Sequence, residues 1–136
     1  MSEVLGLIPA RGGSKGVPRK AVRPMGGRPM ITWTVAAGLA SERLDRVVVT
    51  TEDVEIAAVA RGAGADVPFM RPAELSGDET PGILPVEHAL EWLRREQGYT
   101  PEWVMLLQPT SPLRSAVDID AAVALAEERG ADAVVS

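Results

Sequence analysis

The residue types best suited to bind a polyphosphate are concentrated in one short segment, residues 10–20. Both lysines of the chain, Lys15 and Lys20, lie there with Arg11, Arg19 and three glycines, whereas positive charge elsewhere is arginine. Lysine carries a compact charge on a flexible stem, while arginine presents a planar fork that can bind two phosphate oxygens. Glycine lets backbone N–H groups approach an anion closely. The segment therefore predicts a phosphate-binding loop.

The spacing within this loop excludes two common phosphate-binding motifs. In a P-loop the lysine is followed by Ser or Thr, but here Gly16 follows Lys15. The dinucleotide pattern G-x-G-x-x-G also fails, because Gly12, Gly13 and Gly16 are spaced differently. A solvated loop in an arginine-rich chain is the alternative on these residues alone.

Composition and charge describe one globular domain, residues 1–136, with a local basic patch. The chain is 46% hydrophobic and 24% charged, and it contains no cysteine for disulfides or thiolate metal sites. The net charge of −5 argues against nucleic acid as a partner, and a basic patch within residues 1–30 suits a small anionic ligand. Because no apolar run could span a membrane and no signal peptide is visible, we expect a cytoplasmic protein without a membrane partner.

Apolar, β-branched runs alternate with helical segments along the chain. Strands are predicted at residues 3–9, 46–51, 66–69, 103–107 and 131–136. Helices are predicted from Pro29 to residue 39, from a cap at Asp53 to residue 61, over 83–97, and from Ser115 or Asp118 to residue 128. This alternation predicts an α/β fold, with a mostly parallel, Rossmann-like sheet and helices on both faces. The last predicted strand reaches Ser136 with no polar tail, so we expect either a C-terminal truncation or an edge covered by a partner.

Three loops fall beyond the carboxyl ends of the predicted strands, where parallel sheets bind their ligands. They are residues 10–20, 71–82 and 108–114. We expect these loops to form one site.

Motifs in these loops resemble those of the CMP-sialic acid synthetases, also called acylneuraminate cytidylyltransferases. The string IPARGGSKGVPRK at 8–20 is similar to the family's signature, and MRPAELSGD at 70–78 to its second motif. The string LLQPTSPLR at 106–114 is similar to the third, and His88-Ala89-Leu90 to the helix behind the second. The resemblance covers essentially the whole chain and implies a fold of the nucleotide-diphospho-sugar transferase type.

This resemblance implies a nucleotidyltransferase that transfers CMP from CTP to a nine-carbon 2-keto sugar acid and releases pyrophosphate. N-acetylneuraminate or a related nonulosonate would be the acceptor. Catalytic roles are expected for Arg11 and Lys20, and acceptor binding for Gln108. Nucleotide binding is expected from Arg11, Gly12, Gly13, Ser14, Lys15, Lys20, Arg71, Thr80 and Gly82.

Two features of the chain leave alternatives open. Ala21 stands where the family usually has Asn, which keeps another acceptor, such as a phosphonate, under consideration. The resemblance also implies Mg²⁺, held by an aspartate pair expected downstream of Ser136, so no metal ligand is assigned within this chain. Because the dimerisation region is expected there too, a homodimer is predicted only for a full-length protein. A non-catalytic nucleotide-binding module or an inactive truncation is the remaining alternative.

Several polar residues have a structural interpretation that we favour over a chemical one. His88 lies in the middle of a predicted helix, which indicates a structural role rather than a general base. Asp118 and Asp120 have a spacing that suits a metal, but acids at a helix start commonly complement the helix dipole. Asp78 and Glu79 are interpreted in the same way, as caps of the helix that follows them.

Overall fold

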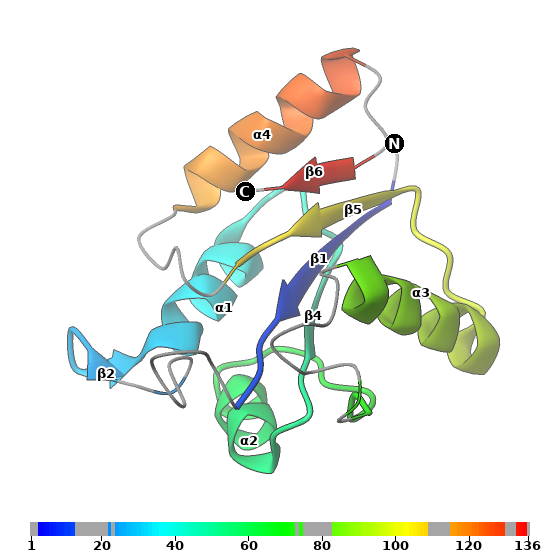
Figure 1. Ribbon diagram of the computed structural model, residues 1–136. Coiled ribbons are helices and arrows are strands. Elements are labelled where there is room, and N and C mark those ends of the chain that lie inside the picture. The colour runs from blue at the N-terminus through cyan, green and yellow to red at the C-terminus, as the bar shows by residue number, and fades with distance from the viewer. Residues whose placement is uncertain are drawn as a thin grey trace.

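A four-stranded parallel sheet, in the order β4-β1-β5-β6, forms the centre of the computed structural model (Figure 1). The structure describes residues 3–12, 22, 24–72, 74, 83–108, 115–129 and 133–135. The strands of the sheet are β1 (Val4–Pro9), β4 (Arg46–Thr50), β5 (Trp103–Leu106) and β6 (Ala133–Val135). The helices are α1 (Met30–Ala40), α2 (Val54–Gly62), α3 (Ile83–Gln97) and α4 (Ala116–Arg129). These elements confirm the predicted α/β fold.

The direction in which the strands are added reverses between β1 and β5. From β1 the chain passes outward to β4, and it then crosses to the opposite side of β1 to form β5 and β6. Register pairs Leu7 with Val48 of β4 on one side and with Leu106 of β5 on the other, all strands being parallel. In such a sheet, connections leave in opposite directions where the order reverses, and ligands bind there. That switch point lies between β1 and β5.

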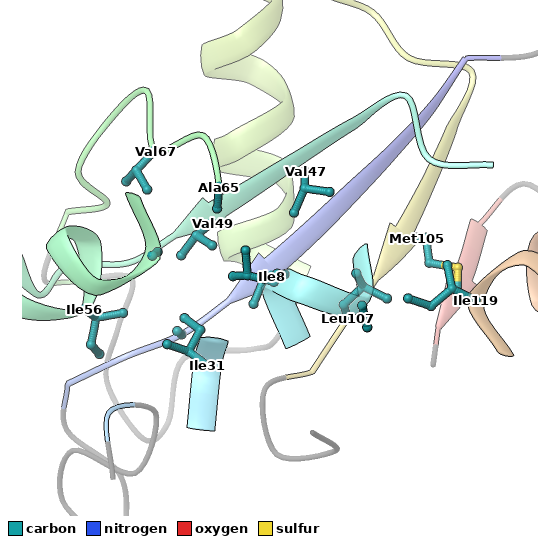
Figure 2. Close-up of a cluster of buried hydrophobic side chains, with 14 of the residues drawn as sticks. Ile8, Ile31, Val47, Val49, Ile56, Ala65, Val67, Met105, Leu107 and Ile119 are labelled. Atoms are coloured by element: carbon teal, nitrogen blue, oxygen red, sulfur yellow. The ribbon is translucent and has the colours of Figure 1, made fainter. Parts of the chain in front are cut away.

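Side chains of β1 alternate between two hydrophobic cores, one on each face of the sheet. Val4 and Ile8 join the core that α1, α2 and α4 cover, and Figure 2 shows Ile8 of this core among side chains from those three helices. Leu5 and Leu7 join the second core, which α3 covers. Because both faces of β1 are buried, the strand offers no polar side chain, and polar chemistry can begin only where it ends.

A short hairpin before α1 was not predicted. It consists of β2 (Pro24–Met25) and β3 (Arg28–Pro29), so Pro29 is the N-cap of α1 rather than its first helical residue. Its turn residues Gly26 and Gly27 have φ values of 60° and 85°. Two successive glycines in this conformation are a known hairpin signal, which the sequence therefore contained. The Arg28 guanidinium lies 3.9 Å from the centroid of the Trp33 ring and holds the hairpin against α1.

The strand predicted at 66–69 is wrong. Only Asp66 pairs with the sheet, through one parallel bridge to Val48 of β4. The next residues leave the edge of the sheet. Val67 joins the core on one face of the sheet, and Phe69 joins the core on the other face. A segment whose side chains pack while its backbone does not pair has the sequence pattern of a strand without being one.

Both acids at the start of α4 have structural roles, as the sequence indicated, but only one caps that helix. Ser115 and Asp118 form a reciprocal capping pair, in which each backbone N–H donates to the other's side chain. Asp120 instead accepts hydrogen bonds from the hydroxyl of Ser41 and the backbone N–H groups of Glu42 and Arg43. Burial raises the pKa of the Asp120 carboxyl, but these hydrogen bonds and the charge of Arg43 outweigh that effect and lower it overall. Asp120 thus fastens α4 to the loop after α1.

We expect Asp120→Ala to destabilise the protein by about 1–2 kcal/mol, because it removes a charged acceptor shared by several donors. Urea unfolding of the variant and the wild type measures the change. The matched control is Glu128→Ala, which removes an exposed acid from the same helix. Equal stability of the Asp120 variant and the control would show that the α1–α4 connection does not depend on this carboxylate.

Candidate active site

Three of the four predicted site residues that the structure describes lie at the switch point. Arg11 and Gly12 follow β1, and Gln108 follows β5 two residues beyond its end. Gly12 is buried, whereas Arg11 and Gln108 are half-buried. Because β1 and β5 are neighbouring parallel strands, Arg11 and Gln108 follow adjacent strand ends at one edge of the sheet.

The exit of β1 is held by hydrogen bonds from segments far away in the sequence. The N–H of Ala10 donates to the carbonyl of Thr50 at the end of β4, with a distance of 3.0 Å. The N–H of Gly12 donates to the carboxylate of Glu52, at 3.0 Å from Oε1 and 3.1 Å from Oε2. The first residues of the predicted phosphate loop therefore have a defined path.

Arg71 is the fourth described site residue, and it contacts the segments that follow β1 and β4. Arg71 is only 4% exposed. Its backbone N–H donates to the carbonyl of Thr51 at 2.9 Å, and its side-chain Nη2 donates to the carbonyl of Ala10 at 3.2 Å. Burial lowers the pKa of the guanidinium, the negative charge of Glu52 opposes this, and the positive charge of Arg11 adds to it. Arg71 therefore joins the ends of β1 and β4. A contact with the nucleotide base stays a prediction.

Gly12 has no space for a side chain. A Cβ built on it would lie 2.3 Å from Oδ2 and 3.1 Å from Cβ of Asp53. Asp53 is held in place because its Oδ1 accepts the N–H of Ile56 at 3.0 Å as the N-cap of α2, as predicted. The close approach of the Asp53 side chain to the backbone of Gly12 explains the glycine at this position.

His88 lies behind the site with the structural role that the sequence favoured. Its ring packs edge-on against Phe69, with centroids 5.2 Å apart. Its Nδ1 is buried and has no hydrogen-bond partner among the described residues. Burial, followed by the positive charges of Arg71 and Arg95, lowers the pKa of the imidazole. The ring therefore supports, in its neutral form, the segment that leads into Arg71.

Sequence reasoning missed Glu52, the acid that contacts the phosphate loop. The available signal was its position just after the end of β4, at the same edge of the sheet as the other site residues. The remaining predicted site residues lie outside the described residues: Gly13, Ser14, Lys15, Lys20, Thr80 and Gly82, with the predicted caps Asp78 and Glu79. Within the described part of the chain, no group of three His, Cys, Asp or Glu residues could hold a metal ion. No helix there is long and apolar enough to cross a membrane.

The family model described as "Cytidylyltransferase" matches residues 5–136. The chain belongs to the cytidylyltransferase family. This confirms the family that the three loop motifs indicated, and it places Arg11, Gly12 and Gln108 at the switch point of a nucleotidyltransferase fold.

Curated relatives of this cytidylyltransferase chain act on several sugar acids. It is 36% identical over 91% of its length to "N-acylneuraminate cytidylyltransferase" of Escherichia coli, and spans 28% of that protein. It is 37% identical over 96% of its length to "CMP-N,N'-diacetyllegionaminic acid synthase" of Legionella pneumophila, and spans 56% of it. It is 39% identical over 79% of its length to "Pseudaminic acid cytidylyltransferase" of Campylobacter jejuni, and spans 46% of it. The chain therefore spans roughly a quarter to just over half of these relatives.

Solved structures confirm the fold of this cytidylyltransferase chain. A CMP:2-keto-3-deoxy-manno-octonic acid synthetase in complex with CTP matches with a TM-score of 0.77 at 22% identity, over 96% of this chain and 49% of that one. A 4-diphosphocytidyl-2C-methyl-D-erythritol synthase matches with a TM-score of 0.67 at 16% identity, over 96% of this chain and 55% of that one. At these identities the likeness concerns the fold alone.

We expect Gly12→Ala to destabilise the protein by about 1–3 kcal/mol, because the new methyl group must displace Asp53 or the start of the loop. Urea unfolding measures the loss. The second variant combines Gly12→Ala with Asp53→Ser, which keeps a capping hydroxyl but removes Oδ2. We expect this double variant to lose less stability than the sum of the losses in the two single variants. Strict additivity would show that the two side chains do not collide.

The chain's only histidine makes the pH dependence of His88 directly measurable. The pKa of His88 is lowered in the folded state, so the unfolded state binds the proton more readily. The free energy of unfolding therefore falls as the pH drops below about 6.5, the pKa of the unfolded state, and through the pKa of the folded state. NMR titration of the single imidazole should give a pKa below that of the urea-unfolded chain. His88→Gln should remove this part of the pH dependence. A folded pKa equal to the unfolded one would contradict the lowering of the His88 pKa by partial burial and by nearby positive charge.

Proposed function

We propose that the protein is a cytidylyltransferase that transfers CMP from CTP to a nonulosonate, a nine-carbon 2-keto sugar acid, with release of pyrophosphate. The observation that carries the proposal is the meeting of Arg11, Gly12 and Gln108 at the switch point of a chain that belongs to this family. The names of three relatives, which specify acylneuraminate, legionaminic acid and pseudaminic acid, support the acceptor class.

In the proposed reaction, the anomeric hydroxyl of the acceptor attacks the α-phosphorus of CTP in line. A bond from that oxygen to phosphorus forms, the bond from phosphorus to the β-phosphate oxygen breaks, and the hydroxyl proton passes to solvent. Arg11, half-buried just after the end of β1, would bind phosphate oxygens through its planar fork. Lys20 would follow the charge onto the leaving pyrophosphate. Gln108, at the end of β5, would orient the acceptor.

The nucleotide base is proposed to bind near the loop that begins at Arg71. Because the guanidinium is buried and already bound to the Ala10 carbonyl, it is held in one orientation before a ligand arrives. Such preorganisation favours selective recognition, since little ordering is needed on binding. Backbone contacts from Thr80 to Gly82, which we also propose, would complete the selection of cytosine.

The described residues do not supply a magnesium site, so no step of the proposed mechanism is assigned to a metal. Mg²⁺ stays a prediction, with its aspartate pair expected downstream of Ser136. A homodimer and a cytoplasmic location also stay predictions. The relatives that name different nonulosonates have similar identities to this chain, 36% to 39%, so the proposal concerns the acceptor class rather than one sugar acid.

The test uses protein expressed from the complete reading frame, compared with the 136-residue chain. Pyrophosphate release is followed with CTP, Mg²⁺ and N-acetylneuraminate, legionaminic or pseudaminic acid, or a phosphonate as the alternative acceptor. We expect turnover with a nonulosonate by the complete protein, and little by the 136-residue chain, because no group of acids among its described residues could hold the expected Mg²⁺. Turnover with the phosphonate alone would replace the proposed acceptor class.

Calorimetric titration with CTP, UTP, ATP and GTP separates base recognition from phosphate binding. We expect CTP to bind best, and Lys20→Ala to weaken its binding by about 1.5–3 kcal/mol, the value of a hydrogen bond to a charged group. The matched control is Arg95→Ala, which removes an exposed charge on α3. Equal binding of the four nucleotides would leave only a general phosphate site.

A further inference from the structure

We propose that the carboxylate of Glu52 is a stand-in for a phosphate group, which occupies the anion position at the exit of β1 until the nucleotide displaces it. This inference rests on the proposed function, because it assigns to Glu52 a role in the affinity for the same nucleotide. It predicts that Glu52 weakens nucleotide binding, although it lies among the groups that bind phosphate.

The contacts of Glu52 are those that an anionic ligand would make. Both carboxylate oxygens lie within hydrogen-bond distance of the Gly12 N–H, at 3.0 and 3.1 Å. Gly12 is the first glycine of the loop predicted to bind phosphate, and its residue is buried. A phosphate oxygen that used this N–H would have to take the place of the carboxylate, because a backbone amide has a single hydrogen to donate.

The charges around Glu52 also match an anion site. The positive charge of Arg71 lies close enough that Glu52 raises its pKa, while Arg11, close to the same guanidinium, lowers it. The two guanidinium groups repel each other, and the carboxylate of Glu52 favours the charged form of Arg71. A nucleotide phosphate would balance them equally, and it would be repelled by the carboxylate if both were present.

Glu52 is not the sole contact that holds the start of the loop, which argues against a purely anchoring role. Two residues before Gly12, Ala10 is already fixed through its N–H to Thr50 and through its carbonyl to Arg71. At Gly12 itself, the side chain of Asp53 occupies the space that a Cβ would take. What Glu52 adds is a partner for a buried N–H, and a buried donor left without a partner is costly. A phosphate that arrives there supplies the same partner.

The experiment compares the CTP affinity of the wild type with that of Glu52→Gln and Glu52→Ala, in protein expressed from the complete reading frame. Calorimetric titration gives the dissociation constants, and thermal unfolding verifies that each variant is folded. The matched control is Glu55→Gln, which removes one negative charge from an exposed position on α2, three residues along the chain. The ¹⁵N–¹H resonance of Gly12 gives a second readout that does not depend on affinity.

We expect both Glu52 variants to bind CTP more tightly, on the order of tenfold, because no charge-assisted hydrogen bond has to be broken first. The Glu55 control should bind as the wild type does. In the wild type, CTP should shift the Gly12 resonance from a carboxylate-bound to a phosphate-bound position.

Other outcomes overturn the inference. If Glu52→Gln binds like the wild type while Glu52→Ala binds more weakly, Glu52 anchors the loop and is not displaced. Unchanged affinity in both variants, or a Gly12 resonance that CTP leaves in place, shows that the nucleotide does not use this N–H. If the wild type binds no cytidine nucleotide at all, the proposed function itself fails, and the Gly12 resonance of the free protein still shows whether Glu52 holds the amide.

Discussion

The arrangement of the site depends on how β1 leaves the sheet. Within a central parallel strand, the backbone N–H and C=O groups form hydrogen bonds with the neighbouring strands. Beyond the end of the strand they need other partners. Here β4 supplies the carbonyl of Thr50, the segment after β4 supplies Glu52, and the guanidinium of Arg71 takes the carbonyl of Ala10. Because buried backbone polar groups need partners, these contacts determine where the loop can begin.

Burial of the sheet on both faces explains why the chemistry is confined to one edge. The β1 side chains Leu5, Leu7 and Ile8 are fully buried, and they belong to the two cores that cover opposite faces. A polar side chain within this strand would need a partner in one of those cores. The first position free of that demand lies beyond Ala10, which is still buried in the core. The neighbouring strand β4 ends opposite Pro9, and β5 ends opposite Leu7. The two cores therefore align the three segments that make up the site.

An acid within the proposed phosphate site has a physical reason in the protein without ligand. Arg71 is a buried cation, and burial of an unbalanced charge is costly. Glu52 lowers that cost, and it gives a partner to the N–H of Gly12. The same features that stabilise the free protein oppose a second anion at that place. Under the proposed role, Glu52 therefore raises the stability of the free protein and lowers its affinity for the nucleotide.

The sequence by itself determined most of the elements, the order of the loops and the family, because those depend on local patterns and on motif order. Strand β1, α3 and the capping role of Asp53 follow from apolar runs and cap residues. Only the tertiary structure showed that Glu52 meets Gly12 and that Asp120 holds the loop after α1. These partners are 40 and up to 79 residues apart, and no local pattern encodes which distant donor a carboxylate will find. Strand order and packing bring them together, and those arise from burial over the whole sheet.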